Sequence, residues 1–172
     1  MKQTIFLVGF MGAGKTTVGK KLAEELNCSF SDLDELIEKK SKQTISHIFE
    51  EGGEEKFRIV ESETLKSINV NKHQVIATGG GTAMYEDNML WMNDNGFTVY
   101  LMLHPGILLH RLAKEKKHRP LIAHLDDVDL FEFIVEKLKK RLLFYNQAKL
   151  ILNGDKKPEL LIEEIKKSIL HN

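Results

Sequence analysis

Short runs of apolar residues that end in glycine or in a turn alternate along this chain with longer segments of helical spacing. The apolar runs predict five strands, at 5–8, 28–31, 74–77, 98–103 and 150–152. Apolar residues three or four positions apart predict helices at 15–26, 33–40, 45–50, 54–68, 107–116, 130–147 and from Pro158 onward. Short buried strands that alternate with helices are typical of a parallel sheet covered on both faces, so the pattern predicts an α/β fold.

The predicted helices between 33 and 68 follow one another without a strand between them, which suggests an insertion into the alternating pattern. The chain has 172 residues, of which 42% are hydrophobic, and this is enough to bury the core of one domain. We find no internal repeat, low-complexity tract or linker, so we expect a single domain over residues 1–172. Four large apolar side chains after the third strand are interpreted as core packing: Met84, Met89, Trp91 and Met92.

Charge and cysteine content narrow the classes of function. Twenty-five basic residues are matched by twenty-five acidic ones, so no overall field recruits nucleic acid or an anionic membrane. The one cysteine, Cys28, cannot form an intramolecular disulfide, which fits a reducing compartment. The apolar stretch 5–13 is interrupted by two glycines, which favours a buried strand over a signal peptide, and no run approaches the roughly 20 apolar residues of a membrane helix. We expect a cytoplasmic protein.

The turn after the first predicted strand carries a phosphate-binding motif. The run Gly9-Phe-Met-Gly-Ala-Gly-Lys-Thr16 has the glycine, four residues and Gly-Lys-Thr of a P-loop, and it lies between a strand and a helix. Its glycines let backbone N–H groups line a phosphate, and the following helix adds the positive end of its dipole. We expect Lys15 to reach the β- and γ-phosphates of ATP and the Thr16 hydroxyl to bind Mg²⁺. The residues expected around the nucleotide are Gly12, Ala13, Gly14, Lys15, Thr16 and Thr17.

A P-loop indicates nucleotide binding but not the use that is made of the nucleotide. A GTP-dependent switch would also need an Asn-Lys-x-Asp sequence to read guanine. The nearest approach is Asn71-Lys-His-Gln74, which lacks the aspartate and precedes a predicted strand instead of following one. The sequence therefore disfavours a switch.

Two carboxylates follow the second predicted strand. In an extended chain Asp32 and Asp34 project to the same side while Leu33 projects to the other, so both would face one point. One could hold Mg²⁺ through water while the other accepts the proton of an attacking hydroxyl, as phosphoryl transfer requires. The alternative is a solvated pair that caps the next helix.

Further along the chain, a glycine triplet and an arginine are candidates for contact with a second substrate. Gly79, Gly80 and Gly81 follow the third predicted strand, where open α/β folds bind ligands, although an ordinary loop would look the same. Arg58 and Glu61 are three residues apart on a predicted helix and can pair, which would hold the guanidinium ready for a carboxylate. Simple solvation of the arginine is the alternative.

The basic run at 114–119, which ends before Pro120, has two interpretations. A charged surface loop is the plainer one. A lid that closes over the phosphates, excludes water and brings Arg119 to the transferring group is the other.

Taken together, these residues resemble the shikimate kinase family, which belongs to the P-loop kinases that are similar to nucleoside monophosphate kinases. The resemblance covers nearly the whole chain, and the order and spacing of its motifs are specific to the family. The motifs are the P-loop, Asp32-x-Asp34, Ile48-Phe49-Glu50 with Gly53-Glu54 and Phe57-Arg58, Thr78-Gly79-Gly80-Gly81, Arg119-Pro120-Leu121, and Arg141 with Tyr145. The chain departs from the family at Ser41-Lys42, where a glycine is common, and between Arg141 and Tyr145, where a proline is common.

The resemblance implies a three-layer α/β/α fold with a five-stranded parallel sheet in the order 2-3-1-4-5. It also implies a substrate-binding insertion at about 33–61 and a lid at about 112–124. The implied reaction is the transfer of the terminal phosphate of ATP, with Mg²⁺, to the 3-hydroxyl of shikimate, which gives shikimate 3-phosphate and ADP on the route to chorismate and the aromatic amino acids.

The resemblance also assigns roles to residues. Arg58 and Arg141 would bind the carboxylate of shikimate, Asp34 its hydroxyl, and Gly79, Gly80 and Gly81 would contact it, with Phe49 and Phe57 as walls. The lid arginine would be Arg119, Arg111 would stack on adenine, and Asp32 with Thr16 would serve the metal. The catalytic residues would be Lys15, Asp34 and Arg119.

Two other functions stay open on the sequence alone. One is a related kinase acting on gluconate or on a nucleoside monophosphate, although the two arginines favour an acid and no base-reading pocket is evident. The other is a protein that binds nucleotide for regulation without transferring phosphate. We expect a monomer whose partners are ATP and shikimate, with no nucleic acid and no membrane.

Overall fold

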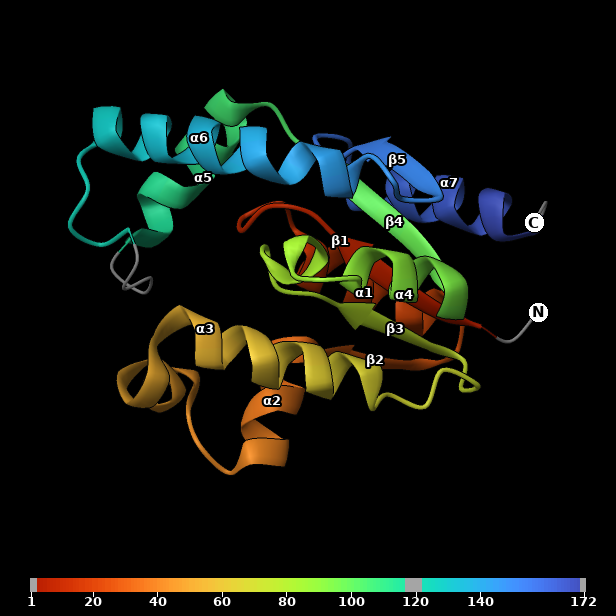
Figure 1. The fold of residues 1–172 in the computed structure, drawn as a ribbon. Coiled ribbons are helices and arrows are strands. Elements are labelled where there is room, and N and C mark those ends of the chain that lie inside the picture. The colour runs from red at the N-terminus through yellow and green to blue at the C-terminus, as the bar shows by residue number, and fades with distance from the viewer. Residues whose placement is uncertain (1–2, 117–121, 171–172) are drawn as a thin grey trace.

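The computed structural model of the chain describes residues 3–116 and 122–170. Its centre is one sheet of five parallel strands in the order β2-β3-β1-β4-β5 (Figure 1). The strands are β1 (Thr4–Val8), β2 (Ser29–Asp32), β3 (Gln74–Ala77), β4 (Phe97–Met102) and β5 (Leu150–Asn153). Each predicted strand is confirmed to within one residue at either end, and the strand order is the one that the resemblance implied.

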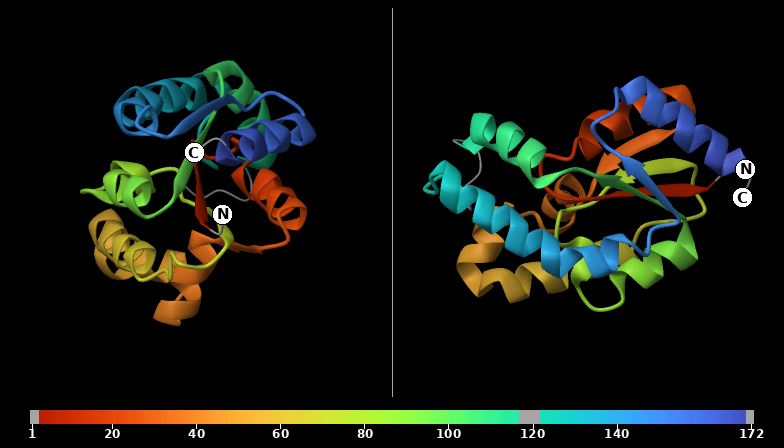
Figure 2. Two further views of the ribbon diagram at one scale, coloured as in Figure 1. Left: turned by 90° about the vertical axis from the view of Figure 1, so that its right-hand side faces the viewer. Right: turned by 90° about the horizontal axis from the view of Figure 1, so that it is seen from above.

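Helices cover both faces of this sheet. They are α1 (Lys15–Glu25), α2 (Leu33–Ser41), α3 (Ile45–Lys66), α4 (Asn88–Asn95), α5 (Pro105–Glu115), α6 (Asp127–Tyr145) and α7 (Pro158–Leu170), with a 3-10 turn η1 (Thr82–Met84). In the end-on view of Figure 2, α3, α4 and α6 lie on one face of the sheet, and α1 and α7 lie on the other. Helix α2 packs against α3 beyond the β2 edge, and α5 packs against α6. The three-layer architecture is therefore confirmed.

Helix α4 was not predicted from the sequence, although its apolar residues were. Met89 and Met92 are buried as expected, and the ring of Trp91 meets Phe6 edge-on with centroids 6.0 Å apart. The helix has only eight residues, and no side chain caps its first turn. With so few positions and no start signal, its periodicity was too short to recognise.

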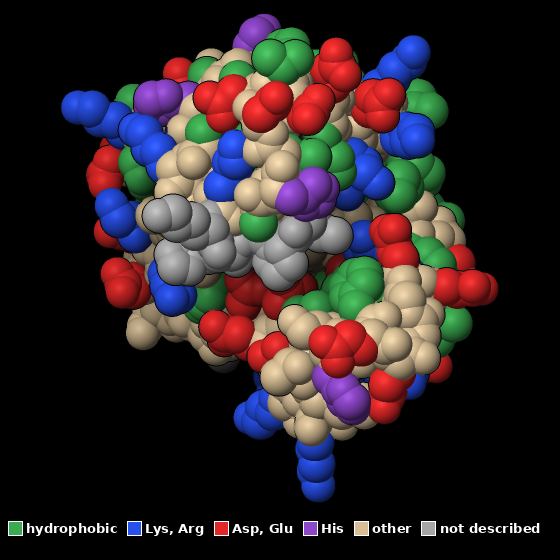
Figure 3. Space-filling model, turned by 90° about the vertical axis from the view of Figure 1, so that its left-hand side faces the viewer, with side chains coloured by type: hydrophobic (Ala, Val, Ile, Leu, Met, Phe, Trp, Pro, Cys, Tyr) green, Lys and Arg blue, Asp and Glu red, His purple; other side chains and the backbone are tan. Residues whose placement is uncertain are grey.

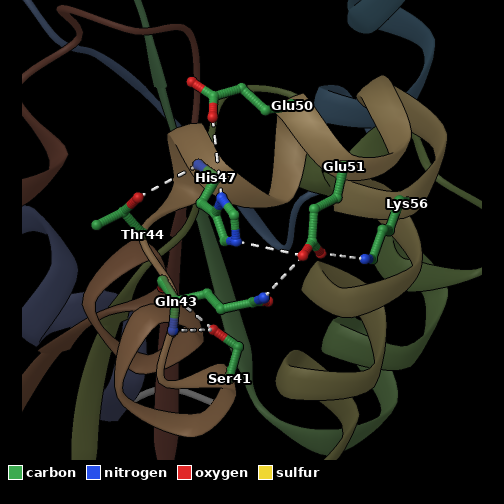
Figure 4. Close-up of polar contacts among 7 residues, drawn as sticks. All are labelled: Ser41, Gln43, Thr44, His47, Glu50, Glu51 and Lys56. Atoms are coloured by element: carbon green, nitrogen blue, oxygen red, sulfur yellow. Dashed lines mark hydrogen bonds and ion pairs between the residues drawn. The ribbon is translucent and has the colours of Figure 1, made fainter.

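Helix α3 is kinked at Gly53, where the sequence predicted two helices, at 45–50 and from 54 onward. The backbone of Gly53 has φ 68° and ψ −164°, a conformation that side chains disfavour. A polar network spans the kink (Figure 4): Glu51 contacts Lys56 at 2.5 Å on one side and His47 Nε2 at 3.2 Å on the other, and it accepts a hydrogen bond from Gln43. Both predicted helices therefore exist, joined through one glycine.

The carboxyl ends of all five strands meet at one edge, because the strands are parallel. The loops after β1, β2 and β3 begin there with the P-loop, Asp32 and Thr78, and these are the segments in which the sequence placed its candidate residues. The central strands β1 and β3 are buried along their whole length, so the loops project from a rigid base.

Candidate active site

The loop after β1 has the conformation that a phosphate site requires. Gly12 and Gly14 have φ values of 78° and 91°, in the left-handed region where glycine is favoured, and Gly14 precedes the first residue of α1. The ammonium of Lys15 donates to the carbonyl oxygens of Gly9 at 2.7 Å and Phe10 at 2.9 Å. The lysine is thus folded back over its own loop, with its charge at the start of the helix.

A cavity of about 320 Å³ opens above this loop. It is lined by nine residues that the sequence singled out: Gly12, Gly14, Lys15, Thr16, Thr17, Asp32, Asp34, Gly79 and Gly80. Met11, Thr78 and Glu115 also line it and were not predicted to do so. Ala13 is buried beneath the loop instead of facing the cavity. Figure 3 looks onto this end of the molecule, where acidic side chains gather in a hollow near the centre of the view.

Asp32 joins the second strand to the P-loop. One of its carboxylate oxygens accepts a hydrogen bond from the Thr16 hydroxyl at 3.0 Å, and the other accepts from the backbone N–H of Asp34 at 3.1 Å, as an N-cap of α2. The strand ends at Asp32, so the expected alternation of Asp32 and Asp34 along an extended chain is wrong. The predicted helix cap is present at Asp32, and it brings both carboxylates to the cavity.

The carboxyl group of Asp34 has a raised pKa. The carboxyl group loses part of its hydration because neighbouring protein atoms cover it, and this raises its pKa. The negative charges of Asp32 and Glu61 also raise the pKa, which lies at about 6. The cations of Lys15 and Arg58 oppose this rise in pKa but do not cancel it. The residue remains open to solvent on one side. A carboxylate with a pKa near 6 is mostly ionised at neutral pH and is a better base than an ordinary aspartate.

Arg58 is held in place by carboxylates, as the sequence predicted for its pairing with Glu61. Its Nη1 lies 2.6 Å from Glu61 Oε2, and its Nη2 lies 3.2 Å from Glu54 Oε1. Glu61 is completely buried and also accepts a hydrogen bond from the Thr82 hydroxyl at 2.5 Å. Burial alone would lower the pKa of Arg58, but the two carboxylates raise it. The alternative interpretation, in which the Arg58 side chain is simply solvated, is therefore excluded.

Arg141 has a different environment. It projects from α6, is 5% exposed, and its Nε and Nη1 atoms are buried without a hydrogen-bond partner among the described residues. Its guanidinium carbon lies 5.0 Å from the centre of the Phe10 ring. Buried donors are almost always paired, so two unpaired donors on one cation suggest a site made for an anion. Tyr145, one helical turn further on, donates a hydrogen bond to the carbonyl of Gly80.

The glycine triplet brings these side chains together. A Cβ atom on Gly79 would lie 2.6 Å from Glu61 Oε1, one on Gly80 would lie 3.1 Å from Arg141 Nη1, and one on Gly81 would lie 2.3 Å from Arg58 Nη2. None of the three glycines has a positive φ, so they are required for space and not for backbone freedom. They are not an ordinary loop, because Arg58 and Arg141 reach the same backbone segment from two helices.

The remaining predicted residues flank this centre. Phe49 and Phe57 stack with ring centroids 4.7 Å apart across the kink in α3, and the guanidinium carbon of Arg58 lies 5.2 Å from the centre of the Phe57 ring. Arg111 donates to the carbonyl of Gly12 at 3.3 Å and lies 3.6 Å from Asp155, so it bridges the P-loop and the segment before α7.

Arg119 and the middle of the expected lid lie outside the described residues. The described flanks of that range are the end of α5 and residues 122–124, where Ile122 belongs to the core.

Within residues 3–116 and 122–170, no group of three or more His, Cys, Asp or Glu side chains could hold a metal ion by itself. The expected Mg²⁺ site does not require such a group, because Thr16 and Asp32 would be two of the ligands and phosphate oxygens would supply others. The hydrogen bond between Thr16 and Asp32 places these two oxygen ligands together at the floor of the cavity, which fits the donor set that Mg²⁺ prefers. No helix in the described part of the chain is long and apolar enough to cross a membrane.

Comparison with known proteins agrees with this geometry. The shikimate kinase family model matches residues 11–170. A shikimate kinase of Phocaeicola vulgatus is 45% identical over 151 residues, which cover 88% of this chain and 86% of that protein. The crystal structure of shikimate kinase from Bacteroides thetaiotaomicron superposes with a TM-score of 0.91 at 40% identity, with 98% of each chain covered. Shikimate kinase from Acinetobacter baumannii, solved in complex with shikimate, gives a TM-score of 0.88 at 36% identity, with coverage of 99% of this chain and 94% of that one.

Proposed function

Because this chain belongs to the shikimate kinase family, we propose that its P-loop, Asp34, Arg58 and Arg141 together transfer the ATP γ-phosphate to the 3-hydroxyl of shikimate. The chain is an ATP-using kinase, and shikimate kinase activity is its function. The proposal concerns the role of each residue, the metal and the state of assembly.

The proposed nucleotide site is the P-loop. The backbone of residues 12–17 would surround the β- and γ-phosphates, with Lys15 supplying positive charge where negative charge develops during transfer. Mg²⁺ at Thr16 and Asp32 would neutralise phosphate charge. Arg111 is close enough to the P-loop to cover the adenine, and Asp155 steadies its guanidinium from the other side.

The proposed shikimate site is the space between Asp34, Arg58, Arg141 and the glycine triplet. The observation that carries it is the buried Arg141 guanidinium, whose Nε and Nη1 donors have no partner among the described residues. Its Nη1 lies 3.1 Å from the point where a Cβ atom on Gly80 would stand. A carboxylate that met Arg141 and Arg58 together would satisfy those donors and balance the charge. The stacked rings of Phe49 and Phe57 would form one wall against the apolar face of the substrate ring.

In the proposed reaction, the 3-hydroxyl oxygen attacks the γ-phosphorus and the bond from that phosphorus to the β-γ bridging oxygen breaks. The hydroxyl proton passes to the Asp34 carboxylate, whose raised pKa of about 6 favours this transfer at neutral pH. Arg119 is proposed, from its place in the family motif, to meet the transferring phosphate. Closure of the lid would exclude water, which otherwise competes with shikimate as acceptor.

We also propose that the enzyme acts as a monomer in the cytoplasm. The partly buried thiol of Cys28, whose pKa is raised by burial, suits a reducing compartment.

A coupled assay of ADP release tests the substrate assignment. The enzyme is offered shikimate, gluconate, AMP or no acceptor, each with ATP and Mg²⁺. We expect ADP release with shikimate to exceed release with the other acceptors by at least about 10²-fold, because only shikimate presents a ring carboxylate to both arginines. Equal rates with gluconate, or a rate that is the same without acceptor, would contradict the proposal.

A further inference from the structure

A second cavity, of about 630 Å³, lies between helix α6 and the outer strands β4 and β5. Among the described residues, it shares no lining residue with the cavity above the P-loop. The buried side chains of Tyr100 and Leu138 line it, and so do three apolar side chains that are unusually open to solvent. These are Met102, Val135 and Leu142, which are 43%, 40% and 36% exposed. Exposed apolar groups that gather around a hollow are typical of a binding site.

The polar groups on this cavity are all positioned to donate. Lys139 forms no ion pair with any residue in the described part of the chain. His104 accepts the N–H of Gly106 on its Nδ1, so the proton of the neutral ring is placed on Nε2, where it can be donated. Asn153 accepts the N–H of Asp155 on its side-chain oxygen, which leaves its amide hydrogens available. No carboxylate is among the described lining residues.

From these features we propose that the cavity is a second ligand site, which binds a small carboxylate with an aromatic or branched apolar body. The volume lies in the range of about 300–1,000 Å³ that small-molecule sites occupy, and apolar walls with a few convergent polar groups are their usual composition. The apolar body would lie against Tyr100 and Val135, and the carboxylate would meet Lys139 at the rim. The hollow shape fits a small molecule better than a flat protein partner.

This second site is connected to the proposed shikimate site through two rings in contact, which are tilted by 34° to each other. Tyr100 packs on Tyr145 with ring centroids 4.8 Å apart, and Tyr145 donates its hydroxyl hydrogen to the carbonyl of Gly80. Helix α6, which forms one wall of the cavity, also carries Arg141. A ligand that packs against Tyr100 and α6 therefore acts on both Gly80 and Arg141, so its binding is coupled to the affinity for shikimate. This coupling rests on the proposed role of Arg141, whereas binding itself does not.

Binding is tested with 3-phenylpropanoate as the probe, by calorimetry on the full chain saturated with shikimate so that Arg58 and Arg141 are already occupied. Two matched probes lack one feature each: 3-phenylpropanamide has no charge, and propanoate has no ring. We expect both to bind at least about tenfold more weakly than 3-phenylpropanoate. The amide loses an interaction with a charged group, and propanoate loses the apolar area that the ring would bury, and each loss is worth about that factor or more.

Matched variants on α6 locate the site. Lys139→Gln should weaken 3-phenylpropanoate about tenfold while Lys140→Gln, at the next and exposed position, should not. Val135→Asp should abolish binding, while Val128→Asp, on the same helix but outside the cavity, should not. Equal effects within either pair would overturn the proposal. Analytical ultracentrifugation provides a further test. If the wild type is a dimer and Val135→Asp is a monomer, the cavity is an interface between two copies and the proposal is overturned.

The coupling between the second site and the shikimate site is tested by steady-state kinetics. Saturating 3-phenylpropanoate should change the KM for shikimate at least about threefold in the wild type and leave it unchanged in Val135→Asp, with the KM for ATP constant in both. A KM for shikimate that stays the same while the probe is bound would refute the coupling. A probe that raises the KM for shikimate equally in both proteins competes at the shikimate site and would also overturn the proposal.

Discussion

The Nη1 atom of Arg141 lies 3.1 Å from the point where a Cβ atom on Gly80 would stand. At this distance a side chain on Gly80 requires its neighbours, the guanidinium first, to shift by a few tenths of an ångström. Because the two residues belong to different elements and the arginine is buried, this spacing fixes how closely the Arg141 guanidinium approaches the glycine triplet.

Substitution of Gly80 tests that contact. In Gly80→Ala the new methyl group should push Arg141 away from the site and raise the KM for shikimate by about 10-fold or more, the value of a hydrogen bond to a charged group. The KM for ATP should change little. Gly106→Ala is a matched control, because a Cβ atom there would make only ordinary contact with His104 at 3.4 Å. Steady-state kinetics that show equal effects for both variants would contradict the assigned geometry.

Lys15→Met should lower kcat by at least about 10²-fold, because it removes a positive charge aimed at the transferring phosphate. The fold should persist, because Lys15 lines the cavity and does not belong to the hydrophobic core. Circular dichroism and ADP release measured on the same preparation check both statements. A variant that keeps most of its activity would contradict the P-loop assignment.

Asp34→Asn should lower kcat by about 10² to 10⁴, because the amide cannot accept a proton. The wild-type rate should fall as the pH drops through the pKa of about 6, and the variant should lack this inflection. The pKa of Asp34 is raised on folding, so its charge opposes folding above about pH 6 and the effect disappears below the unfolded pKa near 3.8. Asp34→Asn should therefore be more stable than the wild type at pH 8 and no more stable at pH 3.5, in thermal unfolding at the two pH values.

The two arginines should differ in their effect on stability, although both should be needed for shikimate. Arg141→Met removes a buried cation with two unpaired donors, so the free energy of unfolding should stay the same or increase. Arg58→Met leaves Glu61 buried without its cation and should cost about 3 kcal/mol. Chemical denaturation of both variants measures this difference. A large loss of stability in Arg141→Met would mean that the residue has a structural role.

Much of this architecture could be predicted from the sequence because the signals were local. The five strands and the P-loop depend on residues that are neighbours in the chain, so Lys15 and Thr16 were placed directly. Asp34 was placed at the cavity for the wrong reason, since a helix cap and not strand alternation turns it toward the cavity.

What could not be derived locally depends on contacts between distant segments. Gly80 and Arg141 lie on separate elements, and only the resemblance to a family suggested that they meet. Glu61 was recognised as a partner of Arg58, but its bond to Thr82 depends on the path of η1. The cavity-lining role of Glu115 had no signal, because an acidic residue near the end of an exposed helix looks the same wherever that helix ends. The kink at Gly53 hid the continuity of α3.

The central claim is that Arg141 and Arg58 bind the carboxylate of shikimate, and a comparison of shikimate with its neutral carboxamide tests it most directly. Arg141→Met suits this test because it is expected to fold as well as the wild type. In the wild type, the carboxamide should lower kcat/KM by about 10-fold to 150-fold. In Arg141→Met that penalty should shrink to a few-fold, because two partners of one interaction are not additive. The same penalty in both proteins would contradict the claim, since the arginine would then not contact the carboxylate.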